Sequence, residues 1–410
     1  MSATATLESP GTRALFPLRK RTGTAAFHLS KEAVDFGSED ISAMSVREAI
    51  EFFAEVRWGS CTEMPCPHCG TVAEHYWSVA QSRWKCTCCG KRFSVTSGTV
   101  FAGHKLPLTK LLSIIFSWAN GSSGMPALQL RREWKVAYAT VFTLIQKVRE
   151  GLTRGFNTGV LCGVQEMDGM DVNGRRYKEK RNRPQGGWAK DKPTIPPQLL
   201  KSKKSEPPFV GPPVPPKFGK TAKQPPDRRI MLVLRLRGRT EGKGACATRV
   251  SVALAESSST VTQMATRFAS AESKFQTDED PSYAQFKKLF AEHKTVNHSQ
   301  TYSTPEGTNN NQAESFNWRF RRAIEGIYLS ASNKYLKDYA AEQAWREDTR
   351  RLSTGQRLRH LLRIAMGVGL SLWWRGYTHG QHREQELLIE GARDAPGRGR
   401  KKGAPVLAPR

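Results

Sequence analysis

The chain has 410 residues, which is enough for two or three domains with ordinary cores. Lysine and arginine total 64 against 37 for aspartate and glutamate, so the formal net charge is +27. This surplus predicts a polyanionic partner, for which nucleic acid is the strongest candidate and a merely solubilising charge is the alternative. No apolar run is long enough to cross a membrane, and the first residues lack the apolar core of a secretory signal. We therefore expect a protein that stays inside the cell and has no membrane partner.

The N-terminal region begins with a segment that is rich in Ser, Thr, Ala and Gly. Residues 1–44 show no sustained apolar period, so we predict a mostly disordered leader. A helix is expected to begin at Ser45, because Ser45 and Glu48 can form a capping box and the apolar residues that follow share one helical face. This helix opens a region, residues 45–104, that also contains a cysteine cluster.

Two CxxC units in this region have the spacing of metal ligands, and a glycine follows each unit. Zinc takes four thiolates at the corners of a tetrahedron, so we predict a zinc ribbon with a closed, structural site. A redox-active pair is the alternative, but such a pair would not require a second matched unit. The four predicted ligands are Cys66, Cys69, Cys86 and Cys89, which leaves Cys61 and Cys88 spare.

Residues 105–155 have helical patterns. Apolar residues recur at three- and four-residue steps from Leu108 to Phe116, and Asn120 with Gly121 then stops the helix. A short helix over 126–132 and a longer one over 137–150 follow. A short helix, a turn and a longer helix are typical of a helix-turn-helix, which favours DNA binding, although any small helical bundle has the same pattern.

Residues 156–350 alternate strand and helix patterns, which indicates a mixed α/β layer. We expect strands over 160–168, 229–237, 247–254 and 274–277, and a helix over 260–268. The last part of the chain, residues 351–410, is expected to form a C-terminal helix and a basic tail.

A Pro-rich basic insert, residues 175–229, separates the first two expected strands. It carries 16 Lys or Arg against 4 Asp or Glu, together with 12 of the 23 prolines. Such a segment cannot bury enough apolar area to offset the entropy of ordering it. We predict an extended basic arm, with a passive linker as the alternative.

Three acidic residues occupy positions that suit a shared metal site. Asp168 ends the first expected strand, Asp278 follows the last one, and Glu314 begins an aromatic and basic helix. Two-metal phosphoryl transfer requires carboxylates from distant parts of a chain, and Mg²⁺ prefers oxygen ligands. Each acid alone is more typical of a solvated surface, but two strand ends and a later helix together favour one site.

Several stretches, taken together and in order, resemble a known family. Over residues 45–350 the chain is similar to the insertion-sequence transposases that pair an N-terminal zinc ribbon with an ISXO-like catalytic domain. The resemblance implies a multidomain protein in which a zinc ribbon and a helix-turn-helix precede an α/β, ribonuclease-H-like DDE domain, here with the long Pro-rich basic insert. The stretches are RW at 57–58, WKCTCCGKRFSVTSGTVF at 84–101, EMDGMDVNG at 166–174, TDEDPSY at 277–283, HKTVNHSQTY at 293–302, NNNQAESF at 309–316 and RRAIEGIYLSASNKYLKDYAAEQAWR at 321–346.

The resemblance also implies roles for individual residues. Asp168, Asp278 and Glu314 correspond to the three catalytic acids, which would bind catalytic Mg²⁺. Asn311 occupies the family's Asn-x-x-Glu position and can supply the third oxygen if Glu314 points away, and His298 corresponds to the histidine after the second acid. Three arginines that follow Glu314 are expected to bind DNA phosphates: Arg319, Arg321, which replaces the family's usual lysine, and Arg322.

The implied activity is the cleavage and rejoining of DNA strands, with water and then a DNA 3′-hydroxyl as the nucleophile. The expected partners are double-stranded DNA, both terminal inverted repeats and target DNA, and further copies of the chain in a homo-oligomer on DNA. The expected location is a bacterial-type cytoplasm, in association with the nucleoid. Two alternatives remain: a catalytically inactive, transposase-derived DNA-binding protein, and a zinc-ribbon transcription factor, which the acidic blocks disfavour.

Overall fold

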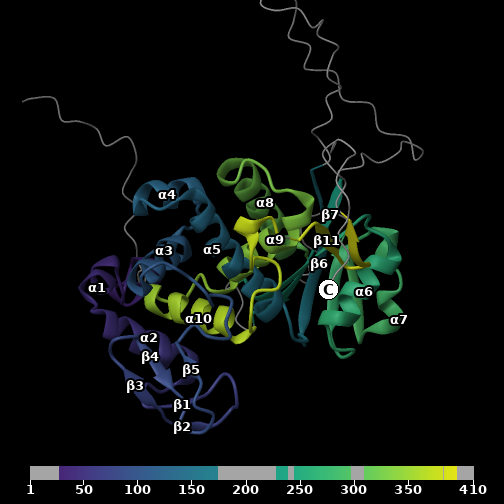
Figure 1. The fold of residues 1–410 in the computed structure, drawn as a ribbon. Helices are drawn as coiled ribbons and strands as arrows, with labels where there is room; N and C mark the ends of the chain where they lie inside the picture. The colour runs from purple at the N-terminus through teal and green to yellow at the C-terminus, as the bar shows by residue number, and fades with distance from the viewer. Residues whose placement is uncertain (1–26, 174–227, 239–243, 297–308, 382, 395–410) are drawn as a thin grey trace, which may run out of the picture.

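The computed structural model describes residues 27–173, 228–238, 244–296, 309–381 and 383–394 (Figure 1). A cysteine-rich and helical N-terminal part is followed by a five-stranded sheet with helices on both faces, then by a helix and a hairpin. Within these ranges, no helix combines the length and the apolar character that crossing a bilayer requires. The predicted basic arm lies outside the described residues, except for its last two positions.

The end of the predicted leader is ordered. Residues 27–44 contain η1 (Phe27–Leu29), η2 (Lys31–Ala33) and α1 (Ser38–Ala43). The Asp35 carboxylate accepts hydrogen bonds from Ser353 Oγ at 2.7 Å and from the Gly355 backbone N–H at 2.8 Å. The prediction of disorder is therefore wrong for this stretch, because its partners lie 318 and 320 positions later and no local pattern reveals them.

The cysteine-rich part consists of a capped helix and short strands. α2 (Val46–Trp58) begins as predicted, since Ser45 Oγ accepts from Glu48 N at 3.2 Å and the Glu48 carboxylate accepts from Ser45 N at 2.7 Å. The Trp58 ring packs edge-on against Trp84 and Phe93, which joins the helix to the strands. The strands are β1 (Glu63–Pro65) paired with β2 (Val72–Glu74), and β3 (Tyr76–Ser78), β4 (Arg83–Lys85) and β5 (Arg92–Phe93) in a second antiparallel sheet.

Three helices follow in the predicted order. They are α3 (Leu108–Asn120), α4 (Ala127–Trp134) and α5 (Tyr138–Gly151), and the π-helical turn η3 (Leu152–Phe156) extends α5. Lys135, in the left-handed conformation at φ 50°, ends α4 and forms the turn to α5. The short helix, turn and longer helix are therefore confirmed as local structure.

The mixed α/β layer is also confirmed, as one five-stranded sheet in the order β10-β9-β6-β7-β8. β7 is antiparallel to β6 and to β8, whereas β6, β9 and β10 are parallel. The strands are β6 (Val164–Val172), β7 (Arg229–Arg237), β8 (Ala245–Ala253), β9 (Lys274–Asp278) and β10 (Glu292–Val296).

The first strand differs from its prediction in extent. It was expected to end at Asp168, but β7 pairs with it as far as Val172, opposite Arg229. Asp168 therefore lies within the strand and faces Val233 of β7. Asp278, in contrast, is the last residue of β9, close to its predicted place.

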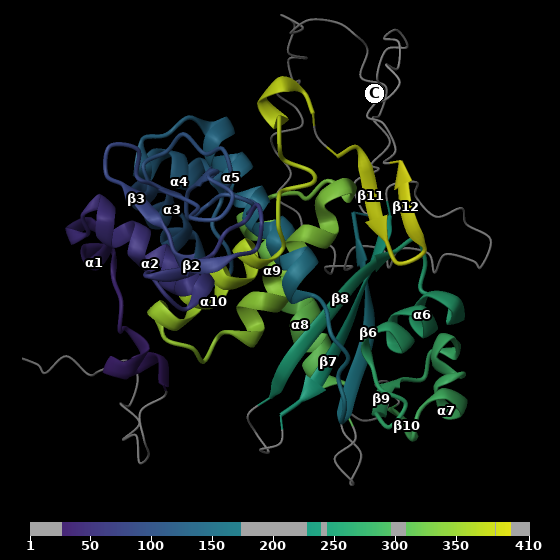
Figure 2. The ribbon, with the colours of Figure 1, turned by 60° about the horizontal axis from the view of Figure 1, so that its bottom comes forward.

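Helices cover both faces of the sheet (Figure 2). Successive side chains of β6 alternate between the two faces: Met167 belongs to one core, whereas Met170 and Val172 belong to the other. One face carries α6 (Ser258–Phe268), η5 (Pro281–Tyr283) and α7 (Phe286–Leu289). The other face, toward the N-terminal helices, carries α8 (Asn311–Arg322), η6 (Ala323–Ile327), η7 (Asn333–Tyr335) and α9 (Leu336–Asp348).

The C-terminal part contains the predicted helix, α10 (Thr354–Gly367), and then η8 (Tyr377–His379). An antiparallel hairpin that the sequence did not predict follows, β11 (Gln385–Leu388) and β12 (Gly391–Asp394). Glu386 accepts from Arg229 Nε at 2.6 Å and from its Nη2 at 2.7 Å, and both side chains are buried. This hairpin is therefore attached to the start of β7 by a buried ion pair.

A buried ionic cluster joins α5 to α9. Glu342 accepts from Arg149 Nε at 2.7 Å, from Arg346 Nε at 2.9 Å and from Tyr328 Oη at 2.5 Å. The Arg346 guanidinium also donates to the carbonyls of Trp118 and Ala119 at the end of α3. A cation at a helix C-terminus satisfies carbonyls that have no partner within the helix. Arg346 does this for α3 while it also binds Glu342, so the cluster links α3, α5 and α9 into one packed unit.

Candidate metal centres and nucleic-acid interface

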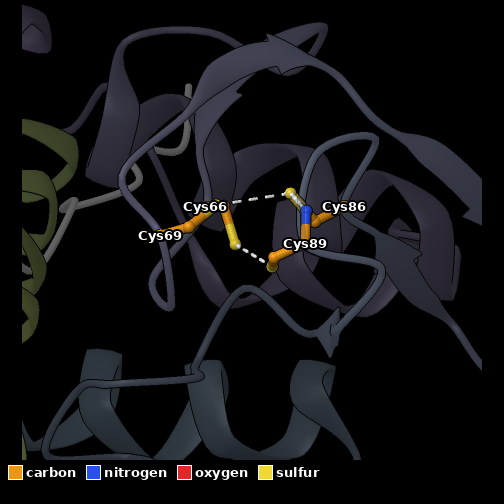
Figure 3. A group of neighbouring side chains, drawn as sticks. All are labelled: Cys66, Cys69, Cys86 and Cys89. Atoms are coloured by element: carbon orange, nitrogen blue, oxygen red, sulfur yellow. Dashed lines mark hydrogen bonds between the residues drawn. The ribbon is translucent and has the colours of Figure 1, made fainter.

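The four predicted zinc ligands come together (Figure 3). Their Sγ atoms all lie within 4.8 Å of one another, with Cys66 Sγ 3.8 Å from Cys89 Sγ and Cys69 Sγ 3.6 Å from Cys86 Sγ. A tetrahedron with Zn–S bonds of about 2.3 Å has edges of about 3.8 Å, so the cluster fits a zinc ion.

Local backbone geometry builds this cluster in two equivalent halves. Gly70 N donates to Cys66 O at 2.8 Å, and Gly90 N donates to Cys86 O at 3.1 Å. Both glycines are left-handed, at φ 79° and 67°, a conformation that costs a residue with a side chain free energy. The glycine after each CxxC unit is therefore part of the turn that aims two thiols at one point.

The surroundings of the cluster shift the pKa values of two of its thiols in opposite directions. The hydrogen bonds with Thr71 lower the pKa of Cys69 to about 6. For Cys89, the Lys91 backbone hydrogen bond lowers the pKa, but desolvation and the other three thiols outweigh it and raise the pKa to about 12. Four thiolates this close together would repel one another, so the cluster suits a bound cation such as zinc.

Asp168 lies in a second, acidic site. Its Oδ1 accepts from the Gly169 backbone N–H at 2.9 Å, and its Oδ2 accepts from Asn317 Nδ2 at 2.7 Å. Burial, together with the nearby carboxylates of Glu256 and Asp278, raises the pKa of Asp168 to about 7. Asp168 and Asp278 are thus close enough to repel each other.

The sheet register explains how Asp168 and Asp278 meet. β6 and β9 run parallel, with Val164 opposite Lys274 and Glu166 opposite Gln276. Two further steps along each strand lead to Asp168 and Asp278. The two parallel strands therefore place both acids at neighbouring positions, just beyond the last paired residues of β6 and β9.

Glu256, which the sequence analysis missed, is the third carboxylate near this pair. It lies between β8 and α6, and its Oε1 accepts from Tyr283 Oη at 2.5 Å. Burial, with repulsion from Asp278, Asp280 and Asp171, raises the pKa of Glu256 even though the Tyr283 hydrogen bond lowers it. An acid directly after a predicted strand and before a Ser-rich helix start was the available signal.

α8 contributes an amide to Asp168. Asn317, one turn after Glu314 on this helix, donates the hydrogen bond to Asp168 described above. Glu314 and Asn311 are both exposed, and neither is among the groups that shift the pKa of Asp168. Among the described residues, the cysteine cluster is the only group of three or more His, Cys, Asp or Glu whose ligand atoms lie close enough to share an ion. His298 lies outside the described residues.

The start of α8 is held to β6 by Glu166. Its Oε2 accepts from the backbone N–H groups of Gln312 at 2.6 Å and Ala313 at 3.1 Å, and its Oε1 accepts from Arg237 Nε at 2.6 Å. A carboxylate at a helix N-terminus satisfies orphan donors and complements the helix dipole. Glu166 therefore fixes the helix that carries Asn317, a role that the sequence analysis did not assign.

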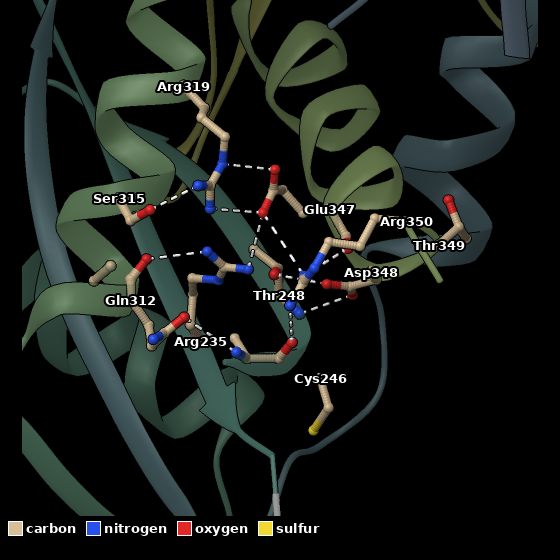
Figure 4. A network of polar contacts seen from close by, with 12 residues as sticks. Arg235, Cys246, Thr248, Gln312, Ser315, Arg319, Glu347, Asp348, Thr349 and Arg350 are labelled. Carbon is tan, nitrogen blue, oxygen red and sulfur yellow. Dashed lines mark hydrogen bonds and ion pairs between the residues drawn. The ribbon is translucent and has the colours of Figure 1, made fainter. Parts of the chain in front are cut away.

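The three arginines of α8 have different surroundings. Arg319 is paired with other side chains: its guanidinium contacts Glu347 at 2.7 Å and Ser315 Oγ at 2.7 Å, beside Arg235 and Arg350 (Figure 4). Arg321 and Arg322 are exposed, and the Arg322 guanidinium lies 5.1 Å from the Trp318 ring centroid. Arg321 and Arg322 are therefore more accessible to phosphates than Arg319, which is half-buried.

A second basic surface lies at the end of α4. Arg131, Arg132 and Lys135 are exposed there and line an open cavity of about 440 Å³, together with Val136 and Ala137. Arg131 and Arg132 lie in the last turn of α4, and Lys135 lies in the turn that leads to α5. These three side chains could donate hydrogen bonds to the phosphates of a nucleic acid.

Comparison with protein families identifies the sheet region. Residues 209–348 match the ISXO2-like transposase domain, so the chain carries a domain of this family, which supports a transposase function. The matched range contains Asp278 and Glu314 and ends with the last residue of α9, whereas β6 and Asp168 precede it. A search of curated proteins and a search of solved structures each found no match.

Proposed function

We propose that this protein is a DDE-type transposase that binds the ends of an insertion sequence and catalyses metal-dependent cleavage and transfer of DNA strands. The observation that carries the proposal is the convergence of Asp168 and Asp278 on adjacent parallel strands of a sheet whose later part matches the transposase domain. The acid-bearing β6 is central, with antiparallel strands on one side and parallel strands on the other, which supports a ribonuclease-H-like fold.

Asp168 and Asp278 are the proposed magnesium ligands, and α8 supplies the third, from Glu314 or, if that side chain points away, Asn311. Carboxylate oxygens suit Mg²⁺, and two half-buried carboxylates that repel each other favour a cation between them. Bound Mg²⁺ would activate the attacking hydroxyl and offset the charge on the leaving oxygen. Asn317 orients the Asp168 carboxylate, and His298 is proposed to act near the scissile phosphate.

DNA would be held by basic surfaces on α8 and at the end of α4. We assign phosphate contacts to Arg321 and Arg322 of α8 and to the basic turn after α4. Arg319 would join them only after leaving Glu347. The zinc ribbon has a structural role, and a homo-oligomer that pairs two DNA ends is the proposed working form.

A catalytically inactive, DNA-binding descendant is the second candidate. The observation that favours it is the absence, within the described residues, of three carboxylates close enough to share one metal ion. Both candidates bind DNA, so only a catalytic measurement separates them.

The test is strand cleavage of DNA that carries the element's ends, with Mg²⁺ and the full chain. We expect Asp168→Ala to reduce cleavage to the level of buffer alone. Asp171→Ala is the matched control, because Asp171 lies on the same strand but is exposed and pairs with Arg228. Cleavage by the intact chain that persists in Asp168→Ala would refute the assignment, and the absence of cleavage with intact DNA binding would favour the inactive descendant.

A further inference from the structure

The strand pairing between β6 and β9 stops short of the two aspartates. The last paired residues are Glu166 and Gln276, two positions before Asp168 and Asp278. Backbone hydrogen bonds therefore do not set the spacing between the acids, which repel each other. Some other contact must hold β6 and β9 together beside the two aspartates.

Glu256 fits closely over β6 at Gly169. A Cβ atom at position 169 would lie 2.1 Å from Glu256 Oε2 and 2.4 Å from its Cδ, which is well inside van der Waals contact. The carboxylate thus occupies the space of the missing side chain. The Gly169 backbone N–H at the same place donates to Asp168, so Glu256 rests on the residue that orients the first acid.

Glu256 also contacts Tyr283, which comes shortly after Asp278 in the sequence. Tyr283 is fully buried and donates from Oη to Glu256 Oε1 at 2.5 Å. It belongs to η5, which Asp280 caps by accepting from Ser282 N at 2.8 Å. Asp280 N also donates to Asp278 Oδ1 at 3.2 Å, so the turn that Tyr283 anchors is the turn that orients Asp278.

We propose that Glu256 is a positioning residue that sets the separation of Asp168 and Asp278 by bridging Gly169 to Tyr283. This inference rests on the proposed function, because it assumes that the two aspartates bind a metal ion. The hydrogen-bond acceptor of Glu256 carries the role, not its charge. Glutamine retains the acceptor and nearly the same shape, so it should substitute for glutamate here.

The test is Mn²⁺ binding to the zinc-loaded full chain, measured by calorimetry, with thermal unfolding of each variant in the absence of Mn²⁺. We expect Glu256→Ala and Tyr283→Phe to weaken Mn²⁺ binding about tenfold, as the loss of a residue that orients metal ligands does. Glu256→Gln should bind within about threefold of the wild type, because the Tyr283 hydrogen bond survives. A role in stability alone would lower the unfolding temperature and leave Mn²⁺ affinity unchanged.

A double-mutant cycle tests the contact with Gly169. Gly169→Ala should weaken Mn²⁺ binding about tenfold in the wild type, since the new methyl group displaces the carboxylate, but should have no further effect with Glu256→Ala. Gly367→Ala is the matched control, because no atom lies within 4 Å of a Cβ there.

Loss of Mn²⁺ binding in Glu256→Gln as large as in Glu256→Ala would overturn the proposal, because the charge of Glu256 would then be what matters. Additive effects in the cycle would also overturn it. Asp168→Asn tests the metal site separately from the role of Glu256. If Asp168→Asn binds Mn²⁺ like the wild type, the proposed metal site is wrong. If Asp168→Asn loses Mn²⁺ binding but the Glu256 and Tyr283 variants do not, only the role of Glu256 is wrong.

Discussion

The zinc ribbon and the acidic site are both candidate metal centres, but the protein builds them in different ways. The four thiols come from 24 consecutive positions, residues 66–89, and already lie within 4.8 Å of one another. The acids come from β6, from the end of β9 and from the segment before α6, and no three of the described carboxylates are that close. Local turns assemble the first site, whereas strand order and long-range packing assemble the second.

This difference has a chemical basis. A structural zinc ion needs a closed tetrahedron of soft ligands, which two CxxC turns can preform. A magnesium site must leave room for water and phosphate oxygens, so its carboxylates are expected to close only around the ion and its substrate.

Loss of the zinc site should have the largest effect. Cys69→Ser removes one of four ligands, so we expect zinc content to fall from about one ion per chain toward zero and residues 61–101 to unfold. Metal analysis and limited proteolysis are the measurements. Cys88→Ser is the matched control, because Cys88 is exposed and outside the cluster. Full zinc content in Cys69→Ser would contradict the ligand assignment.

Glu342→Ala tests whether the helical and sheet regions unfold together. It leaves the buried guanidiniums of Arg149 and Arg346 without their shared carboxylate, so the free energy of unfolding should fall by about 3–5 kcal/mol. Urea denaturation measures the change, and a second transition would show that the regions had uncoupled. Glu55→Ala, which removes an exposed partner of Arg359, should change stability by less than about 1 kcal/mol.

The acidic site should make stability depend on pH in the absence of metal. The pKa of Asp168 is raised from 3.8 to about 7 by burial and by Glu256 and Asp278, so the folded state holds its proton more tightly than the unfolded state. The stabilisation is complete below about pH 4 and is lost as the pH rises to about 7, with an upper bound of about 4 kcal/mol.

This dependence can be isolated by comparing the wild type with Asp168→Asn in urea across that pH range. The wild type should lose stability relative to the variant as the pH rises, and saturating Mg²⁺ should reduce the loss. Parallel curves for the two proteins would show that Asp168 titrates normally and that its carboxylate is not crowded.

The smallest effect is expected at the helix that leads into the zinc ribbon. Ser45→Ala removes the side-chain acceptor for Glu48 N, and the free energy of unfolding should fall by about 1 kcal/mol. Zinc content should not change, because the cap contacts no ligand. Thermal unfolding with zinc analysis checks both statements. A loss of zinc would show that the helix and the ribbon are more tightly coupled than local assembly implies.

The parts of this molecule that the sequence predicted are those with local causes. The capping box at Ser45, the two CxxC turns with their glycines and the order of α4 and α5 depend on neighbouring residues, and each was predicted within a few positions. The proposed metal ligands Asp168 and Asp278 were chosen from their expected places at strand ends, and the family resemblance implied the same pair. Glu256 was missed because its partners, Gly169 and Tyr283, are distant in sequence and neither carries a charge.

Other misses have the same origin. The Asp35 carboxylate, in the segment before Ser45, accepts hydrogen bonds from the start of α10, and Glu386 of the β11–β12 hairpin accepts from Arg229. A local window of sequence contains neither partner. Asp168 was predicted to end its strand, whereas the pairing with β7 continues for four more residues.

The end of β6 and the start of β7, which flank the Pro-rich insert in the sequence, lie side by side. Val172 pairs with Arg229 across β6 and β7, and the Asp171 carboxylate forms an ion pair with Arg228. A loop whose ends are already fixed can change in length at little entropic cost. This place is therefore where an engineer could shorten the chain, graft a reporter domain or open the backbone for circular permutation without shifting the register of the sheet. It is also where sequence length could vary among descendants of this gene without selection against the fold.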